Sequence, residues 1–404
     1  MNVSQRVAGM LVVGALLLSA CGGGTGTPPP GAGASGAAGG PAFADQPVTL
    51  NILDVAGQDQ LVKGIFDKYK KEFPNRLRDY KIEKATSPEM PAKLKAQKDA
   101  GNLQTALVLT GLDGMAAGVE QGIWDQLLPK YGAKFDELQK NYLDAAKPIQ
   151  ERTKGFAIMV VYTPSGPLFE YNPAKVPSPP KTAAELLAWA KANPNKLLYA
   201  RPANSGPGRT LLQGLPYVLG DKDPKDPEKG WDKTWQFLRD LDPYIEYYPT
   251  GTTATMKELA EGTRSIIAST MGWDINPRVL GQVPKEMKTF RLDNTTFVAD
   301  EQFMAVPKGL DDARLAVALD IIAYSLRPEN QAFTYDAGYF YPGPAVKGAT
   351  LAQAPAESQQ AIKDFGRAEY DQWATEAKIV VPLDTKQLVT AFDLWDKAVG
   401  AKKR

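Results

Sequence analysis

The sequence predicts an α/β protein of two domains, and three observations lead to that prediction. Segments with strand periodicity and segments with helix periodicity alternate between residues 48 and 120, and a second alternation begins at residue 156. The chain has 404 residues, more than the roughly 100–200 of a typical single domain. Because strands that alternate with helices are typically parallel, we expect mostly parallel sheets flanked by helices.

The first domain begins with three strand–helix units. Val48, Leu50 and Ile52 alternate with polar residues, as in a half-buried strand. The apolar residues that follow have helical spacing up to Pro74, and the continuous apolar run at 105–110 is typical of a fully buried strand. We expect strands at 48–54, 80–83 and 105–110 and helices at 58–73, 90–100 and 115–120.

The remainder of the chain has the same mixture of elements. Thr182 and Glu185 have the spacing of a capping box, which marks the start of a helix. A loop rich in Gly and Pro at 204–208 precedes another helix. We expect further strands at 156–162, 197–200, 265–271 and 296–306, and further helices at 231–241, 254–261, 313–326 and 388–399.

The N-terminal segment has the features of an export signal. The apolar run from Val7 to Leu18 follows Arg6 and is too short to span a bilayer as a helix. The stretch Leu18-Ser19-Ala20-Cys21 resembles the bacterial lipobox, in which the cysteine becomes the acylated mature N-terminus. We expect a signal peptide at 1–20 and a membrane anchor on Cys21, on the periplasmic or outer side of the membrane. The alternative is an ordinary secretion signal that ends at a chance cysteine.

Residues 21–46 are predicted to form a flexible linker. Between Gly22 and Ala44 nearly every residue is Gly, Ala, Pro, Ser or Thr, and none is charged. Such a segment buries too little apolar surface to offset the entropy of ordering it. About 20 flexible residues reach ~25 Å, which would hold a folded body away from a membrane surface.

The composition excludes several kinds of site. With 47 basic and 46 acidic residues, the formal net charge is +1, and nothing favours a nucleic-acid partner. One cysteine and no histidine allow no disulfide within the fold, no Ser-His-Asp or Cys-His nucleophile and no usual zinc site. Hydrolysis of a glycoside by two carboxylates is still allowed.

Several short motifs resemble those of the substrate-binding proteins of ABC importers, in the broad extracellular family 1 group. They lie at 122–128 (GIWDQLL), at 169–190, where the sequence resembles the hinge crossing of that family, and at 259–268. The likeness extends from about 48 to 404. It implies a type II periplasmic-binding-protein-like fold with two lobes and a hinge. Lobe 1 would comprise 47–165, lobe 2 would comprise 166–296, and residues 297–404 would return mainly to lobe 1.

The resemblance also implies a function. Such a protein captures a small-molecule solute between its lobes and delivers it to a membrane permease, as a monomer, with no cofactor and no enzymatic activity. The branch resembled most includes polyamine, iron and thiamine carriers; iron carriers typically use His and paired Tyr, and the lack of His disfavours iron. The alternatives are an exported enzyme that acts on carbohydrate through carboxylates, and a structural or adhesive lipoprotein.

Ligands of two-lobed α/β proteins bind outside the carboxyl ends of strands, so the loops after predicted strands are candidate sites. After the first strand these residues are Asp54, Ala56, Gly57 and Gln58, and after the third they are Thr110, Gly111 and Asp113. The alternative role for an aspartate in such a loop is a helix N-cap.

The loop at 204–210 is the candidate anion site. Ser205 and Gly206 precede a helix whose first backbone N–H groups suit a carboxylate or another anion. Arg209 could add a bidentate contact, and Thr210 follows it. Thr252 starts a helix after a similar loop. The alternatives are a capped helix with a solvent-facing arginine for the first loop and a plain N-cap for the second.

Aromatic residues form the last group of candidates. Trp273 and Asp274 follow a predicted buried strand, and a ring beside a carboxylate suits a cation or a sugar. Tyr341 belongs to the densest aromatic cluster of the chain, together with Tyr339 and Phe340. The alternatives are a packed Trp with a capping Asp, and aromatic rings buried at an interface.

Overall fold

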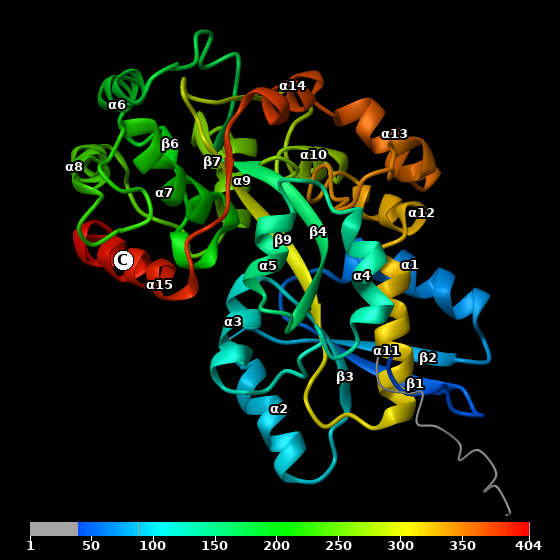
Figure 1. The fold of residues 1–404 in the computed structure, drawn as a ribbon. Coiled ribbons are helices and arrows are strands. Elements are labelled where there is room, and N and C mark those ends of the chain that lie inside the picture. Colours follow the sequence, from blue (N-terminus) through cyan, green and yellow to red (C-terminus); the bar gives the residue numbers. More distant parts are fainter. Residues whose placement is uncertain (1–38, 88, 404) are drawn as a thin grey trace, which may run out of the picture. The chain divides into compact units, whose positions relative to one another are not determined.

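The computed structural model describes residues 39–87 and 89–403, which form two sheets, each with its own hydrophobic core (Figure 1). We call the part built on the first sheet lobe 1 and the part built on the second sheet lobe 2. Cys21, the predicted signal peptide and most of the predicted linker lie outside the described residues. No helix in the described ranges is long and apolar enough to cross a membrane.

The sheet of lobe 1 has the strand order β10-β9-β3-β1-β2, and β4 also pairs with β9. The pairs β1–β2, β1–β3 and β9–β10 are parallel, whereas β9 is antiparallel to both β3 and β4. The three predicted strand–helix units are confirmed as β1 to α3. The strands are β1 Val48–Asp54, β2 Leu77–Lys84, β3 Thr105–Thr110, β4 Ala157–Gly166, β9 Phe297–Ala305 and β10 Ile379–Val380.

The sheet of lobe 2 has the order β6-β7-β5-β8, with β5 Leu168–Tyr171, β6 Leu197–Leu198, β7 Ile266–Ser269 and β8 Lys288–Phe290. Only β6 and β7 are parallel, because β5 runs antiparallel to both β7 and β8. The two-lobed α/β fold is confirmed, but the expectation of a mostly parallel sheet is wrong for lobe 2. Only Pro167 separates β5 from β4, so the direction of β5 is set by its continuation from lobe 1, which apolar periodicity does not reveal.

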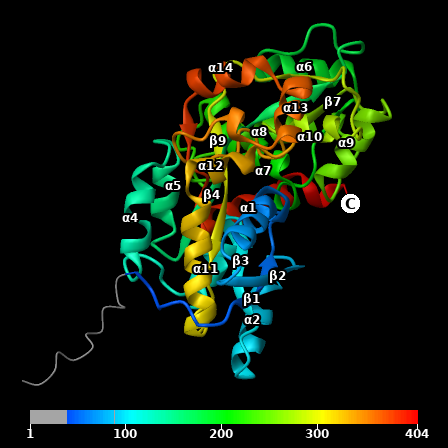
Figure 2. The same ribbon diagram turned by 90° about the vertical axis from the view of Figure 1, so that its right-hand side faces the viewer.

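Helices cover both sheets (Figures 1 and 2). Thr182 begins α6 as expected: its hydroxyl accepts from the Glu185 backbone N–H, while the Glu185 carboxylate accepts from the backbone of Lys181 rather than of Thr182. The α-helices are α1 Asp59–Glu72, α2 Met90–Asp99, α3 Leu112–Glu120, α4 Gly132–Lys140, α5 Lys147–Arg152, α6 Ala183–Ala192, α7 Gly206–Leu219, α8 Asp232–Leu241, α9 Thr252–Ala260, α10 Ile275–Val279, α11 Asp312–Ser325, α12 Pro328–Gln331, α13 Ala356–Phe365, α14 Ala368–Glu376 and α15 Thr385–Ala398.

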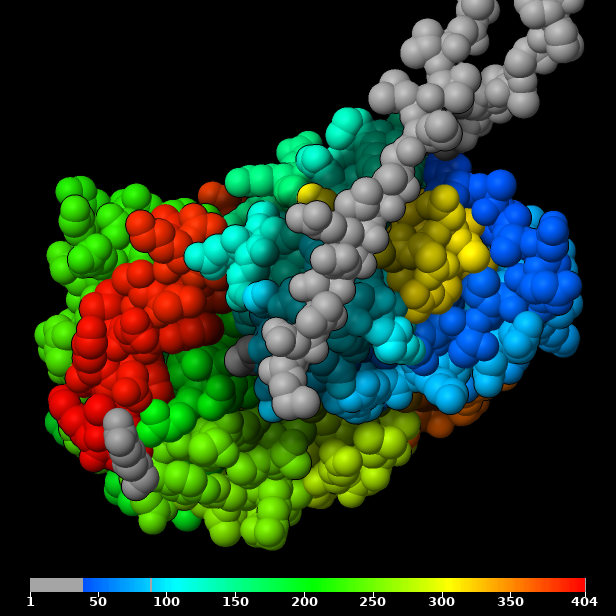
Figure 3. Space-filling view, turned by 90° about the horizontal axis from the view of Figure 1, so that it is seen from below, coloured from blue at the N-terminus to red at the C-terminus, as the bar shows by residue number. Residues whose placement is uncertain are grey.

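The C-terminal part of the chain contributes to both lobes. The sequence predicts that residues 297–404 return mainly to lobe 1, and β9 and α11 do lie in its core. Helix α15, in contrast, lies in the core of lobe 2, where the Trp395 indole N–H donates to the Tyr199 hydroxyl at 3.1 Å. Figure 3 shows this red segment against the green surface of lobe 2. Lobe 2 is therefore completed by the last helix of the chain.

The end of the predicted linker contacts lobe 1. The Phe43 ring lies 4.1 Å from the guanidinium of Arg76 and 5.5 Å from the Lys134 ammonium. Both cations also pair with Asp320 on α11, at 2.9 and 3.1 Å. The chain thus joins the folded body on the side of lobe 1 formed by these residues.

Candidate functional site

A cleft between the two lobes brings together most of the loops that the sequence singles out. It has an empty volume of about 870 Å³, part of which is open to solvent. Its base is β9, one of the two long strands that run between the lobes in Figure 1. Lobe 1 contributes Val55, Ala56, Gly111, Leu112 and Asp113; helix α7 contributes Gly206, Arg209, Thr210 and Gln213; β9 contributes Ala299, Asp300, Glu301 and Gln302; the aromatic lining is Trp273, Tyr339 and Phe340.

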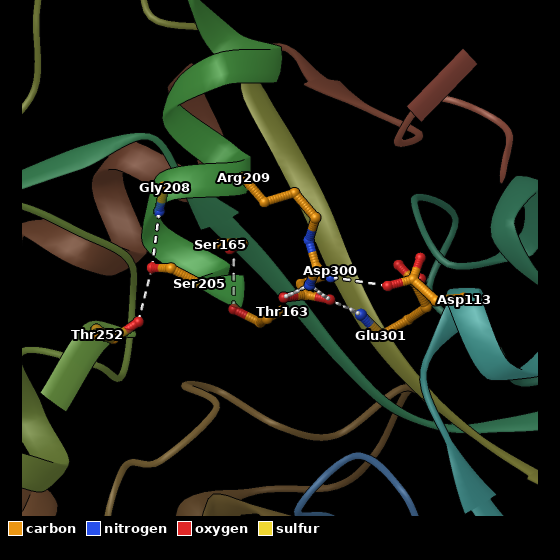
Figure 4. A network of polar contacts seen from close by, with 9 residues as sticks. All are labelled: Asp113, Thr163, Ser165, Ser205, Gly208, Arg209, Thr252, Asp300 and Glu301. Carbon is orange, nitrogen blue, oxygen red and sulfur yellow. Dashed lines mark hydrogen bonds and ion pairs between the residues drawn. The ribbon is translucent and has the colours of Figure 1, made fainter. Parts of the chain in front are cut away.

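The first turn of α7 is fixed by two hydroxyl groups. The Ser205 side chain accepts from the Gly208 backbone N–H at 3.1 Å and shares a hydrogen bond of 2.7 Å with the Thr252 hydroxyl (Figure 4). Both residues are buried, so their role is to hold the helix start in place. A Cβ atom at Gly206 would lie 3.9 Å from the Trp273 indole nitrogen, which places the start of α7 at the wall of the cleft.

Arg209 projects from that turn to two carboxylates. One of its terminal nitrogens lies 3.1 and 3.3 Å from the two Asp300 oxygens, and the other lies 3.5 Å from Asp113 on α3 (Figure 4). The charge of Asp300 is the main cause that raises the pKa of the Arg209 guanidinium. An anion in this cleft would have to compete with both carboxylates for Arg209, which weakens the anion-site interpretation of the 204–210 loop.

Two buried side chains beside this pair have hydrogen-bond acceptors that are not used. Glu301 is 2% exposed and Gln302 is 5% exposed. Among the described residues, one Glu301 carboxyl oxygen and the Gln302 amide oxygen have no hydrogen-bond partner. Burial, and then the charge of Asp300, raise the pKa of the Glu301 carboxyl well above its usual value. A buried acceptor without a donor is costly, so both oxygens are suited to receive a donor from a ligand.

Aromatic side chains line another part of the same cleft. The Trp273 and Tyr339 ring centroids are 5.1 Å apart, and Tyr339 and Phe340 are 5.4 Å apart. A close approach of the backbone fixes this wall, because a Cβ at Gly272 (φ +99°) would lie 2.5 Å from the Tyr339 carbonyl oxygen. Burial, and then the charge of Asp54, raise the pKa of the Tyr339 hydroxyl to about 12, so the ring stays neutral.

The predicted site residues divide into two groups in the structure. The residues that line the cleft are Ala56, Gly111, Asp113, Gly206, Arg209, Thr210 and Trp273. The others support it or lie elsewhere. The Asp54 carboxylate accepts from the backbone N–H groups of Ala56, Gln58 and Asp59. A Cβ at Gly57 would lie 3.5 Å from the Tyr339 hydroxyl. The remaining predicted residues are the buried Gln58 and Thr110, then Ser205 and Thr252, described above, and finally Asp274 and Tyr341.

Asp274 belongs to a buried charge cluster and not to the lining of the cleft. Its carboxylate is bound by Arg278 at 3.0 Å, by Arg367 at 2.8 Å and by the Tyr370 hydroxyl at 2.5 Å. Tyr341 is not among the lining residues either, and its hydroxyl donates to Asp371 at 3.1 Å. Arg278 is four positions from Asp274, but Arg367, Tyr370 and Asp371 come from the C-terminal 40 residues, roughly, and sequence spacing does not predict contacts with them.

Sequence reasoning did not identify the polar residues of β9 at the base of the cleft. Asp300, Glu301 and Gln302 are three consecutive polar residues inside the otherwise apolar strand 297–306. A strand with that pattern does not alternate as expected, and this departure is the signal that could have identified them. Within the described residues, no group of three or more His, Cys, Asp or Glu is arranged to hold a metal ion.

Comparison with known proteins agrees with this architecture. A family model described as bacterial extracellular solute-binding protein matches residues 64–366. No curated protein matches the sequence. Solved structures with the same fold include an ABC transporter protein from Clostridium perfringens (TM-score 0.63, 16% identity, 88% of this chain and 100% of that chain covered). They also include PotD, a spermidine/putrescine ABC transporter substrate-binding protein from Streptococcus pneumoniae (TM-score 0.60, 16% identity, 87% of this chain and 98% of that chain covered).

A third similar structure is IdiA (FutA) from Trichodesmium, in complex with iron and citrate (TM-score 0.61, 14% identity, 87% of this chain and 100% of that chain covered). At such identities the likeness to solved structures describes the fold. The family match extends over most of the folded part of the chain. The protein belongs to the family of bacterial extracellular solute-binding proteins.

Proposed function

We propose that this protein is the solute receptor of an ABC importer, and that it captures a small organic cation between its lobes and delivers it to a membrane permease. The observation that supports this proposal most is the chemistry of the cleft. Three acidic residues, Asp113, Asp300 and Glu301, meet a single basic residue, Arg209, among the residues that line it. Asp113 and Asp300 outnumber Arg209 and leave the lining with a net negative charge, and Glu301 and Gln302 add hydrogen-bond acceptors.

The aromatic wall fits the same class of ligand. An ammonium group is attracted to the face of Trp or Tyr, and more strongly where water is excluded. Trp273 and Tyr339 line the same cleft as Glu301 and Gln302, whose side chains each have an oxygen without a hydrogen-bond partner among the described residues. An organic ammonium compound can use both features, because its N–H groups donate to the acceptors and its cationic group contacts the rings. A phosphate or a carboxylate would be repelled by the same floor.

The proposed role is binding and release, without a chemical step. The acidic residues of the cleft are held by Arg209 or lie buried with a raised pKa, and no nucleophile activated by histidine exists in the chain. We also propose that the protein is exported and held at the membrane by an acylated Cys21. A receptor tethered in this way would stay near its permease.

Thermal unfolding of the purified full chain in the presence of a ligand panel tests this function. The panel holds butylamine, putrescine, spermidine, choline, thiamine, glucose and inorganic phosphate. A receptor gains stability as the free ligand rises above its dissociation constant, by about 2.7 kcal/mol at a hundredfold excess. We expect at least one ammonium compound to raise the midpoint and phosphate to leave it unchanged.

A matched variant assigns the effect to the cleft. Trp273→Ala removes one aromatic face and should abolish most of the ligand-induced shift, whereas Trp235→Ala, on α8 in lobe 2, should leave it intact. If glucose or phosphate, and no ammonium compound, raised the midpoint, the receptor role would stand and the cationic class would be wrong. If no compound did so and the protein hydrolysed a glycan, the receptor role itself would be wrong.

A further inference from the structure

Arg209 is a cation that the protein itself places in the cleft. It extends from the first turn of α7, in lobe 2, and it is the only Lys or Arg among the described residues that line the cleft. Its side chain is 27% exposed, against 15% for Asp300, so the pair is partly shielded from water. The Ser205–Thr252 hydrogen bond fixes the turn that carries it. Arg209 is thus held over the carboxylates and is not a mobile surface side chain.

The side-chain acceptors of the cleft fall into two sets. Asp113 and Asp300 are already engaged by Arg209, at 3.5 Å and 3.1 Å. Glu301 and Gln302 form the second set, and each retains an oxygen without a hydrogen-bond partner among the described residues. Only the second set is free to receive donors from a ligand. The first would accept a cation only if Arg209 were displaced.

We propose that Arg209 fills one of two cation positions in this cleft and so restricts the solute to a single positive charge. The ammonium group of the solute occupies the other position, against the rings of Trp273 and Tyr339, with the Gln302 amide oxygen as its acceptor. A second ammonium group in the same cleft would meet the guanidinium of Arg209 and be repelled. This inference rests on the proposed function, and it narrows the solute to a monocation.

Two amines with the same carbon chain test whether the cleft selects a solute with a single positive charge. Butylamine carries one ammonium group and putrescine carries two, so the ratio of their dissociation constants reports charge selection. A variant that alters lobe closure in general changes both dissociation constants by the same factor, so their ratio is unaffected. For the wild-type full chain, calorimetric titration should give butylamine binding at least as tight as putrescine binding. Arg209→Gln should shift the ratio by about tenfold in favour of putrescine, since it frees Asp113 and Asp300.

Two control variants make this shift specific. Arg209→Lys keeps the positive charge and should retain the wild-type ratio. Arg239→Gln removes an exposed arginine of α8 that is not part of the cleft lining, and should also leave the ratio unchanged. A preference for putrescine in the wild type, or an unchanged ratio in Arg209→Gln, would overturn the proposal. Binding of neither amine would overturn it too, while a response to another panel compound would leave the receptor role standing.

A measurement without any ligand tests the resident cation independently. The free energy of unfolding is measured for the wild type, Arg209→Gln, Asp300→Asn and the double variant. The proposal expects the two substitutions to be non-additive, because each removes a partner of the other. If the two effects on the free energy of unfolding simply add, Arg209 does not pair with Asp300 in solution. The proposed restriction of the solute to one positive charge would then be wrong.

Discussion

Glu170 is the most isolated acidic group of the described residues. It lies on β5 with no exposed surface, and neither of its carboxyl oxygens has a hydrogen-bond partner there. Burial, and then the charge of Asp274, raise its pKa well above the usual 4.5, although Arg278 and Arg367 oppose this. The folded protein therefore keeps a proton on Glu170 at a pH where the unfolded chain has lost it.

This proton makes stability depend on pH with a known sign. The contribution of Glu170 is neutral below about pH 4.5 and becomes destabilising as pH rises, because the folded state then binds more protons than the unfolded state. Glu170→Gln cannot ionise. Its free energy of unfolding should fall less steeply above pH 4.5 than that of the wild type, by up to about 1.4 kcal/mol per pH unit. Chemical denaturation between pH 4 and 8 measures the two slopes.

An exposed glutamate provides the comparison for that experiment. Glu137→Gln, on the surface of α4, should leave the wild-type slope unchanged. If Glu170→Gln and the wild type had parallel curves over the whole range, Glu170 would be ionised in the folded protein. Its charge would then be balanced by Arg278 and Arg367, as in an ordinary buried ion pair.

Asp274 shows how a residue read from the sequence as a ligand contact can be structural. Asp274→Asn leaves Arg278 and Arg367 buried without their carboxylate, and removing one partner of a buried ion pair typically costs about 3–5 kcal/mol. We expect a loss of that size in the free energy of unfolding, with the affinity of the surviving folded protein for an ammonium ligand unchanged. Asp240→Asn, on the exposed side of α8, is the control. A normal stability combined with lost ligand binding would return Asp274 to the binding site.

At the scale of elements, the start of α7 connects the fold to the site. Ser205 caps the helix, and the same turn holds Arg209 against Asp300. Ser205→Ala should lower the free energy of unfolding by about 1 kcal/mol, the usual effect of losing an N-cap. It should also weaken the coupling between Arg209 and Asp300 in the double-variant cycle. Ser205→Thr keeps a hydroxyl and should restore both quantities; if both serine variants behaved alike, the cap would not position the arginine.

Long periodic elements were predictable, and short or atypical ones were not. The strand at 105–110 and the helix at 313–326 carry clear apolar patterns, and both agree with β3 and α11 to within one or two residues. The strands β8 and β10 have three and two residues, too few for any periodicity. Helix α13 and helix α14 were not predicted, since few of their residues are buried and their apolar stripes are short.

For the molecule as a whole, the order of elements along the chain predicted two α/β lobes, but not how the chain returns between them. The burial of Trp395 beside Tyr199 joins the last helix to lobe 2, through a contact between residues almost 200 positions apart. The same is true of the cleft: Asp113, Arg209 and Asp300 come from three separate segments. Sequence reasoning named Arg209 and Asp113 as separate candidates, but it did not identify Asp300, and the contacts among the three depend on the packing of the lobes.

We expect the predicted anchor to be separable from the folded body. Phe43 and the residues after it contact lobe 1, far along the chain from Cys21. Cys21→Ser should therefore move the protein from the membrane fraction to the soluble fraction of exporting cells. The affinity of the purified variant for an ammonium ligand should equal that of the wild type. Loss of ligand binding in this variant would contradict a tether without a role in the site.

The distance between the lobes, with and without solute, tests the central claim of capture between lobes most directly. Spin labels at Lys63→Cys on α1 and Lys257→Cys on α9 replace exposed side chains of lobe 1 and lobe 2, and Cys21→Ser leaves these as the only thiols. With the ammonium compound that raises the thermal midpoint at saturation, the account predicts that the distance distribution shifts and narrows to one population. An identical distribution with and without that compound would contradict capture between the lobes.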